Sequence, residues 1–363
     1  MKKFYMNLAI ELARKGAYHT SPNPMVGAVC VKNGKIISTG YHARFGEFHA
    51  ERRCLTKELD FKGSELYVNL EPCSHPGKTP PCTDIIIEKG VKKVYISHRD
   101  PNPKVDGISI LKKHNIDVEI GILKDKAIEL NQPFLCNMKK NRPYITLKIA
   151  TSLDGKIAAE NGSSKSISSN AALKFVHILR AESDAILIGS NTAVFDNPML
   201  TVRYGDFEKR IIRVILDSTL KIPLESNLIR TIDSNPLIIF TSENANGEKT
   251  GILKDKGVDV KIVAKKDNKL DLNLIVQELY SMGVGKLMVE GGGKIASSFL
   301  RDNLVDRIIQ EIAIDKILGG SMSYSKDVFY DSPENGRIIK SWKTFDLDDN
   351  IIIEGIINVY RDN

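Results

Sequence analysis

The hydrophobic and polar positions of residues 1–120 alternate between helical spacing and short continuous apolar runs. Apolar residues recur at helical spacing over about residues 3–15, which predicts an amphipathic opening helix. Two apolar runs, residues 26–31 and 36–39, flank Asn33-Gly34, and Asn-Gly is a favoured turn of a two-residue hairpin. Further runs predict helices over residues 49–58 and 83–89 and strands over residues 66–70, 91–97 and 116–122. Helices interleaved with strands indicate a layered α/β domain.

The first pattern ends in a polar stretch, residues 131–143, and a new apolar strand begins at Tyr144. We therefore predict two domains, residues 1–142 and residues 143–363. In the second half, strands are expected over residues 144–149, 185–188, 211–216, 237–241, 258–263, 286–289, 307–313 and 351–359, and helices over residues 171–182, 272–282 and 295–303. The chain shows no internal repeat, so the halves are expected to be two different α/β domains.

Composition narrows the class of protein. The 363 residues are 42% hydrophobic and 27% charged, as in soluble globular proteins, and no apolar run reaches the length of about 18–20 residues that a membrane span needs. Asn7, Glu11 and Arg14 interrupt the N-terminal apolar stretch, which therefore predicts a helix of the mature protein rather than a signal peptide. Five cysteines are too few for a disulfide scaffold, so we expect a cytoplasmic protein.

The net charge of +7 has two interpretations. One is a Lys-rich solvated surface, and the other is that some of the cations bind a phosphate group. No basic run has the density of a nucleic-acid-binding arm, so neither a nucleic acid nor a membrane is the expected partner.

The strongest candidate chemistry lies between residues 49 and 82. His49 and Glu51 open a predicted helix, Cys73 follows a proline, and Cys82 closes the segment EPCSHPGKTPPC. Taken singly, these residues could be a helix start and core cysteines. Together, one imidazole and two thiolates make three tetrahedral zinc ligands and leave a fourth position open, as a catalytic zinc site requires. Glu51 would then be the general acid/base, as in cytidine-type deaminases.

The spacing of the two cysteines departs from the common deaminase pattern Pro-Cys-x-x-Cys, because eight residues separate Cys73 from Cys82. The intervening SHPGKTPP contributes His75 and Lys78. This donor-rich loop either recognises a polar substrate or is a solvated surface loop.

The expanded segment EPCSH-x-G-K-T-P-P-C, together with SPNPMVGAV and HARFGEFHAE, resembles the bifunctional riboflavin-biosynthesis deaminase–reductase family. The resemblance covers essentially the whole chain. It implies an N-terminal cytidine-deaminase-like α/β/α domain followed by a dihydrofolate-reductase-like α/β domain. The implied first reaction is hydrolytic removal of the 2-amino group from 2,5-diamino-6-ribosylamino-4(3H)-pyrimidinone 5′-phosphate, with Zn²⁺ as cofactor.

The resemblance also implies roles for residues of the first half. His49, Cys73 and Cys82 would bind zinc, Glu51 would move the proton, and Asn23, His42 and Lys78 would contact the substrate. The side-chain amide of Asn23 offers donors and an acceptor suited to a base edge, although an asparagine in a Pro-flanked turn is equally explained by conformation.

Three segments of the second half suggest a ligand site. An apolar strand runs into Ser152-Leu153-Asp154-Gly155-Lys156, and strand ends are where open α/β sheets bind ligands. Arg180 and Arg203 suit a phosphate, or else make surface salt bridges. The turn Glu290-Gly291-Gly292-Gly293-Lys294 joins a strand to a helix, where backbone N–H groups can face a phosphate. No G-x-G-x-x-G is present, so a Rossmann domain is not supported.

By the same resemblance, the second half is an NADPH-dependent reductase that converts the ribosyl group of 5-amino-6-(5-phosphoribosylamino)uracil to ribityl. The residues implied for its substrate are Ser164, Arg180, Arg203 and Glu290, and those implied for its cofactor are Ser166, Thr192, Asp196, Ser218, Gly292, Gly293 and Lys294. Relatives of the family assemble as dimers or tetramers, so a homo-oligomer is expected.

Four positions depart from the family pattern. Pro76 replaces a larger residue, and Gly107 is not followed by a second nearby glycine. Ser166 replaces a tryptophan, which could weaken cofactor binding, and Asn197 replaces a second aspartate.

Two rival functions therefore stay open. A deaminase whose second domain only binds or assembles would show no NADPH binding. A nucleic-acid-editing deaminase would bind single-stranded RNA, although the long cysteine spacing argues against it. A purely structural zinc module is disfavoured by Glu51, which leaves metal chemistry open.

Overall fold

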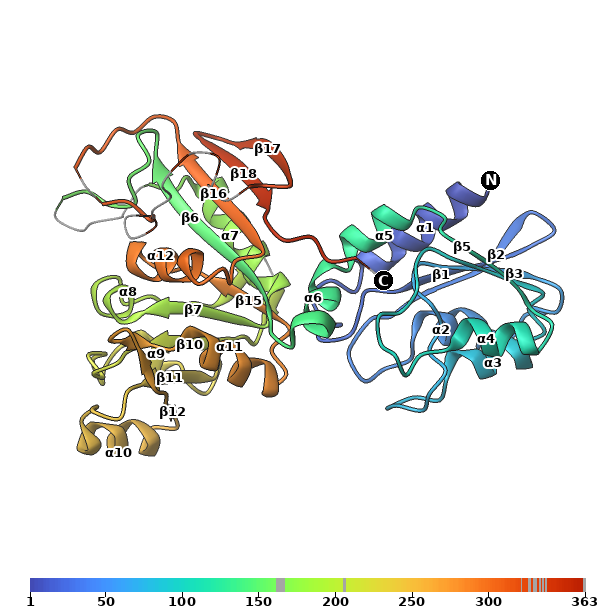
Figure 1. Ribbon diagram of the computed structural model, residues 1–363, viewed down its shortest axis with the longest axis horizontal. Helices are drawn as coiled ribbons and strands as arrows, with labels where there is room; N and C mark the ends of the chain where they lie inside the picture. The colour runs from blue at the N-terminus through green and yellow to red at the C-terminus, as the bar shows by residue number, and fades with distance from the viewer. Residues whose placement is uncertain are drawn as a thin grey trace. The chain divides into compact units, whose positions relative to one another are not determined.

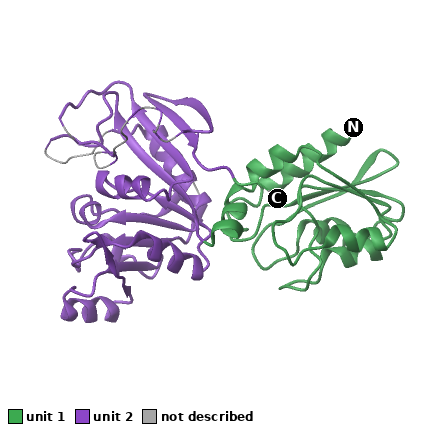
Figure 2. Ribbon diagram, in the orientation of Figure 1, with its two compact units in different colours: residues 1–141, 360–363 green, residues 142–359 purple. Residues whose placement is uncertain are grey.

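The computed structural model describes residues 1–160, 167–204, 207–320, 322–325, 328, 332, 334, 336 and 338–361. The chain forms two compact units (Figure 2). Unit 1 contains Met1–Asn141 and the chain from Tyr360 on, and unit 2 contains Arg142–Val359. The sequence pattern assigned the last residues to the second domain. Tyr360 instead lies with unit 1, because its backbone N–H and carbonyl both pair with the Gln132 side chain, each at 2.7 Å.

Unit 1 is built on a five-stranded sheet with the order β2-β1-β3-β4-β5. Its strands are β1 (Gly27–Lys32), β2 (Lys35–Tyr41), β3 (Glu65–Val68), β4 (Lys93–Ile96) and β5 (Asp117–Ile120). Strand β1 is antiparallel to both β2 and β3, whereas β3, β4 and β5 are parallel. Asn33 and Gly34 both have positive φ, so the β1–β2 hairpin turns where the sequence predicts.

Helices cover both faces of this sheet (Figure 1). Alternate residues of β1 explain the layers, since Ala28 and Cys30 belong to one core cluster and Val29 and Val31 to the other. Helices α2, α3 and α4 supply the first cluster, and helices α1 and α5 supply the second. The helices of the unit are α1 (Lys2–Arg14), α2 (Ala50–Leu55), α3 (Cys82–Glu88), α4 (Gly107–Lys113), α5 (Lys124–Leu130) and α6 (Gln132–Lys140). The unit is an α/β/α sandwich.

Helix α6 lies inside the stretch that the sequence pattern marked only as a polar boundary. Its buried residues are Gln132, Leu135, Cys136 and Asn137. Two of these four are polar, so the apolar periodicity that would have predicted a helix is missing. The amides are buried because they have partners, as Gln132 has in Ile128 and Tyr360.

Unit 2 is built on a nine-stranded sheet with the order β12-β11-β10-β7-β15-β6-β16-β18-β17. Its strands are β6 (Tyr144–Ser152), β7 (Ala185–Gly189), β10 (Ile212–Leu216), β11 (Leu237–Thr241), β12 (Asp259–Ile262), β15 (Lys286–Val289), β16 (Arg307–Ala313), β17 (Ser341–Leu347) and β18 (Asn350–Ile356). The sheet is parallel from β12 to β16, and β18 and β17 are antiparallel additions.

Helices also cover both faces of the second sheet (Figure 1). Leu287 and Val289 of β15 pack with α11 and α12, and Met288 between them packs with α7. The helices are α7 (Asn170–Glu182), α8 (Ser190–Phe195), α9 (Asn227–Arg230), α10 (Gly247–Asp255), α11 (Leu272–Ser281) and α12 (Gly293–Arg301). Two small hairpins, β8 (Val202–Tyr204) with β9 (Phe207–Lys209) and β13 (Lys265–Lys266) with β14 (Lys269–Leu270), complete the unit.

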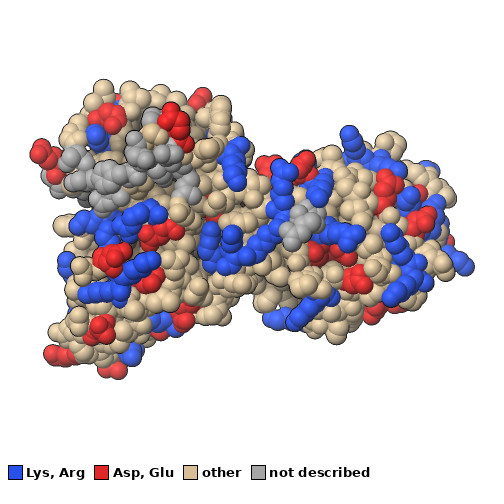
Figure 3. All heavy atoms as spheres, viewed as in Figure 1, with Lys and Arg blue, Asp and Glu red and all other residues tan. Residues whose placement is uncertain are grey.

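The parallel strands of unit 2 end at one common edge of the sheet. The segments that follow β7, β10, β12 and β15 therefore emerge on the same side, where open α/β sheets bind ligands. On the face shown in Figure 3, basic and acidic side chains are interspersed over both units. No helix in the described part of the chain is both long and apolar enough to cross a bilayer.

Candidate active sites

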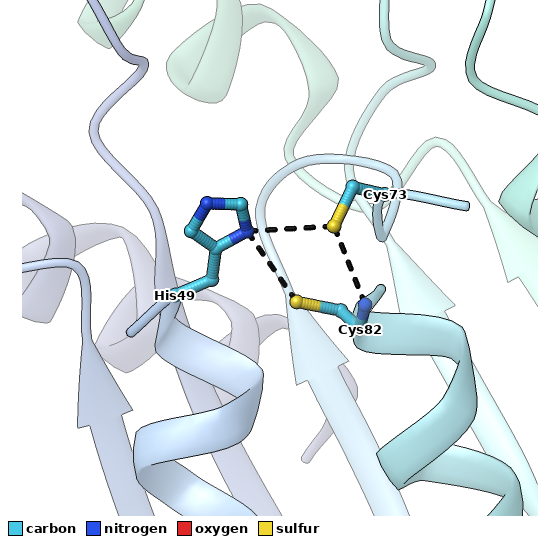
Figure 4. Close-up of side chains that lie close together, drawn as sticks. All are labelled: His49, Cys73 and Cys82. Carbon is cyan, nitrogen blue, oxygen red and sulfur yellow. Dashed lines mark hydrogen bonds between the residues drawn. The ribbon is translucent and has the colours of Figure 1, made fainter. Parts of the chain in front are cut away.

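Three side chains from separate segments converge at one edge of the unit 1 sheet. His49 is the N-cap residue of α2, Cys82 is the first residue of α3, and Cys73 lies in the segment between β3 and α3. His49 Nδ1 lies 3.4 Å from Cys73 Sγ and 3.5 Å from Cys82 Sγ (Figure 4). Among the described residues, this is the one group of three or more His, Cys, Asp or Glu side chains close enough to hold a metal ion.

The chemistry of the three donors fits zinc. Cys73 Sγ accepts a hydrogen bond from the backbone N–H of Cys82 at 3.3 Å. Hydrogen bonding from Cys82, helped by His49, lowers the pKa of Cys73 to about 4, so a thiolate is present at neutral pH. None of the five cysteines forms a disulfide. One nitrogen and two sulfur ligands leave a coordination position for a reactant, as catalytic zinc sites do.

Glu51 lies in the first turn of α2, two residues after His49, and is 3% exposed. Its Oε2 atom is buried and has no hydrogen-bond partner among the described residues. Burial, followed by the nearby charge of Cys73, raises the pKa of Glu51 to about 7. Helix α2 can approach β2 because Gly40 lacks a side chain, since a Cβ there would lie 2.4 Å from the Ala50 carbonyl oxygen.

The metal-binding group opens into a cavity of about 230 Å³. Asn23, His42 and Lys78, the three predicted substrate contacts, all line this cavity. His42 Nδ1 lies 3.2 Å from the Phe48 carbonyl oxygen, and its Nε2 lies 3.1 Å from Asn23 Nδ2. Because the carbonyl can only accept, Nδ1 carries the proton and Nε2 accepts from Asn23. Burial lowers the pKa of His42, which favours this neutral form.

The cavity wall also contains residues that the sequence did not indicate. Lys78 Nζ lies 4.0 Å from the centre of the Phe45 ring, a cation–π contact at the mouth of the cavity. Asp100 lines the cavity too, and burial raises its pKa to about 6. Asp100-Pro101-Asn102-Pro103 is 27 residues past Cys73, so spacing alone could not associate it with the metal ligands.

In unit 2, Arg180 of α7 and Glu290 after β15 form a two-point ion pair, with Nε–Oε1 and Nη2–Oε2 distances of 2.7 and 2.8 Å. Burial acts to raise the pKa of Glu290. The charge of Arg180, the hydrogen bonds that Arg180 donates and the charge of Lys148 outweigh burial, so the pKa of Glu290 is lowered. Arg180 Nη1 donates to the Thr201 carbonyl at 3.2 Å. For the Arg180 guanidinium the sequence allows a phosphate or a salt bridge, and the salt bridge and the Thr201 contact largely occupy it within the protein.

Arg203 lies beside this pair, because its backbone N–H donates to Nδ1 of His177, also on α7, at 3.1 Å. The Arg203 residue itself is exposed. The structure thus brings Arg180, Arg203 and Glu290 together. Ser164 and Ser166 lie outside the described residues.

The glycines of the β15–α12 turn have different roles. A Cβ at Gly293 would lie 2.4 Å from the Ser323 carbonyl oxygen, so Gly293 is required by packing. A Cβ at Gly292, the N-cap of α12, would meet only Thr192 Oγ1, at 3.8 Å. The open approach to the helix N-terminus is therefore at Gly292, with Thr192 beside it.

Two more predicted cofactor residues, Ser218 and Lys294, line a second cavity of about 300 Å³. Asp196 is the C-cap residue of α8 and is not among the residues that line it. Asn197 replaces an aspartate of the family pattern, and its contacts with Asn227 do not explain the replacement, because an aspartate could accept the same hydrogen bonds. Its Oδ1 and carbonyl oxygen accept hydrogen bonds from Asn227 N and Nδ2, each at 2.8 Å, and so attach this loop to α9.

The fold and the two sites define a zinc-dependent deaminase unit joined to a reductase unit of another fold. Residues 1–98 match the cytidine and deoxycytidylate deaminase zinc-binding region, and residues 143–332 match the RibD C-terminal domain. The chain belongs to the RibD family of riboflavin biosynthesis proteins. It is a bifunctional deaminase and reductase, with Zn²⁺ and NADPH as cofactors.

Similarity to RibD proteins extends over nearly the whole chain. The chain is 43% identical to the riboflavin biosynthesis protein RibD of Aquifex aeolicus, covering 97% of each chain. It is 36% identical to RibD of Escherichia coli, covering 87% of this chain and 88% of that one. Crystal structures of RibD from Acinetobacter baumannii (33% identity, TM-score 0.87) and of a deaminase/reductase from Thermotoga maritima (35%, 0.84) each cover 98% of this chain and 99% of their own. The expected fold class, with a cytidine-deaminase-like domain before a dihydrofolate-reductase-like domain, is confirmed.

Proposed function

We propose that unit 1 removes the 2-amino group of 2,5-diamino-6-ribosylamino-4(3H)-pyrimidinone 5′-phosphate, and that unit 2 reduces the ribosyl group of 5-amino-6-(5-phosphoribosylamino)uracil to ribityl. The observation that carries the proposal is the convergence of His49, Cys73 and Cys82 beside the buried carboxylate of Glu51. The Thermotoga maritima relative, whose name states both activities, supports the pairing of the reactions.

In the deaminase site, His49, Cys73 and Cys82 hold zinc. When bound, zinc lowers the pKa of water towards about 7 and so makes hydroxide available at neutral pH. Glu51 takes the proton of the attacking water and passes it to the departing amino group. The C–N bond breaks, a carbonyl replaces the amidine carbon–nitrogen bond, and ammonia leaves.

Substrate recognition in unit 1 follows from the side chains around the cavity. Asn23 gives one N–H to His42, which leaves its carbonyl oxygen and second N–H for the pyrimidine edge. Lys78, held against Phe45 at the mouth of the cavity, meets the 5′-phosphate.

In unit 2, NADPH, when bound, would supply the hydride for C1′ of the ring-opened ribose, and solvent would supply the proton for the nitrogen bonded to C1′. Arg203 binds the substrate phosphate, whereas Arg180 fixes the carboxylate of Glu290 towards the base. Ser164 completes the substrate contacts. The cofactor contacts are Ser166, Thr192, Asp196, Ser218, Gly292, Gly293 and Lys294.

A coupled assay on the purified zinc-loaded protein tests both activities. We expect the diamino-pyrimidine ribosyl phosphate to release ammonia first, and NADPH absorbance to fall only after ammonia appears. Release of ammonia without NADPH oxidation would reduce the proposal to a deaminase with a silent second unit. Ammonia release from single-stranded RNA, with none from the ribosyl phosphate, would overturn the deaminase assignment.

We further propose that the protein works in the cytoplasm as a homo-oligomer. None of the five cysteines forms a disulfide, which supports a reducing compartment. Strand β17 lies at the edge of the nine-stranded sheet, and its Trp342 is 70% exposed, which supports association through this edge. Sedimentation equilibrium should give a mass of at least 80 kDa, about twice the chain mass of 40.4 kDa, and a mass near 40 kDa would exclude the oligomer.

A further inference from the structure

The second cavity of unit 2 extends beyond the residues already assigned to the cofactor. It reaches from the ends of β7 and β10, at Ser190 and Ser218, across the first turn of α12 to the β13–β14 hairpin. Leu216, Leu270 and Leu272 are buried and give it an apolar floor. The cavity therefore lies at the carboxyl edge of the sheet and is a slot only in the sense that an apolar floor is bounded by a polar rim.

The hairpin places two lysines at the rim of this slot. Asp267 and Asn268, its two turn residues, have φ values of 50° and 60°, as a tight two-residue turn requires. Lys266 and Lys269 flank the turn and are directly paired across the hairpin. Side chains of such a pair lie on the same face, and both lysines line the cavity.

The charges around the slot leave it open to an anion. Asp302 pairs with Arg301 at 3.1 Å, and the Asp271 carboxylate caps α11 by accepting from Asn273 N at 2.9 Å. The charged residues that line the cavity are four basic ones, Lys266, Lys269, Lys294 and Arg301, and three acidic ones, Asp267, Asp271 and Asp302. The rim between the hairpin and α12 therefore keeps an excess of positive charge.

We propose that the β13–β14 hairpin binds the 2′-phosphate on the adenosine end of NADPH, and that Lys266 and Lys269 thereby select NADPH over NADH. This inference rests on the proposed reductase function. NADPH differs from NADH only in that phosphomonoester, which is a dianion at neutral pH and needs several N–H donors. With Gly292 and Lys294 facing the pyrophosphate, the adenine lies on the leucine floor and the 2′-phosphate meets the paired lysines.

The test compares the wild-type protein, Lys266→Gln/Lys269→Gln and the control Lys265→Gln. Lys265 precedes Lys266 on β13, is equally exposed, and does not line the cavity. Calorimetric titration with 2′,5′-ADP and with 5′-ADP measures the affinity for the adenosine end of the cofactor without any turnover. Titration with NADPH and with NADH measures the affinity for the whole cofactor. We expect the double variant to bind 2′,5′-ADP and NADPH at least about tenfold more weakly, with 5′-ADP and NADH changed less than about twofold. The control should match wild type.

Three results would overturn the inference. They are equal binding of 2′,5′-ADP and 5′-ADP by wild type, an unchanged affinity of the double variant for NADPH, or an equal loss of NADPH and NADH binding. The proposed function can fail separately. If the lysines discriminate the 2′-phosphate but no NADPH is oxidised in the coupled assay, the subsite stands and the reductase assignment falls. If NADPH is oxidised in the coupled assay while the double variant still binds NADPH more tightly than NADH, the reductase assignment stands and the proposed subsite falls.

Discussion

Glu51→Gln should lower the rate of ammonia release by about 10³-fold while leaving one zinc ion bound per chain. The amide keeps the shape of the side chain but can no longer take and return a proton, and such transfers contribute about 10²- to 10⁴-fold to enzymatic rates. His49, Cys73 and Cys82 are untouched, so metal affinity is retained. Ammonia release measured beside zinc content by atomic absorption separates loss of the proton shuttle from loss of the metal.

Glu58→Gln is the matched control, because Glu58 is an exposed glutamate just beyond the same helix. It should keep wild-type deamination. Wild-type ammonia release by Glu51→Gln would show that another group moves the proton. If the variant is given the deaminated intermediate, NADPH oxidation should proceed at the wild-type rate.

Asp306→Asn should lower the free energy of unfolding of unit 2 by about 3–5 kcal/mol, because it leaves a buried guanidinium without its counter-charge. The fully buried Asp306 carboxylate accepts hydrogen bonds from Arg142 Nη1 and Nη2, at 2.7 and 2.8 Å. It also accepts from Ile145 N at 2.9 Å and Asn358 Nδ2 at 3.1 Å. One carboxylate thus ties together the start of β6, the start of β16 and the segment after β18.

Hydrogen exchange of peptides from β6 and β16 in increasing urea measures this loss, since those strands belong to unit 2 alone. Asp315→Asn serves as the control, because Asp315 is exposed and its one ion pair among the described residues is with its neighbour Lys316, at 3.2 Å. Exposed pairs contribute about 0–1 kcal/mol, so the control should change little. Equal effects of the two substitutions would show that the Asp306 network does not stabilise unit 2.

The deaminase centre was predictable because its chemistry is concentrated in one segment. His49, Glu51, Cys73 and Cys82 fall within 34 residues, and a ligand set of one imidazole and two thiolates has few other uses. Three parallel strands of the unit 2 sheet were predictable for a related reason. Buried parallel strands are continuous apolar runs, so β7, β11 and β15 begin at the expected residues.

Other features could not be predicted because they depend on polar groups that are satisfied only after folding. Helix α6 was missed because Gln132 and Asn137 are buried amides. The sequence leaves open whether Arg180 binds a phosphate or forms a salt bridge, because Glu290, which pairs with its guanidinium, lies 110 residues away. The sequence predicts that Gly293 contacts the cofactor, and it could not indicate that packing against Ser323 also requires a glycine there.

The pairing of Tyr360 with Gln132 has a consequence for the genetics of this chain. The polypeptide passes between the units twice, at residues 141–142 and 359–360, so unit 2 is, in covalent terms, an insertion within unit 1. A gene split at the first junction alone would encode a deaminase fragment whose Gln132 has lost both contacts with Tyr360. A deaminase expressed alone would keep both contacts only if the segment from Tyr360 were joined to it, as a circular permutation would do.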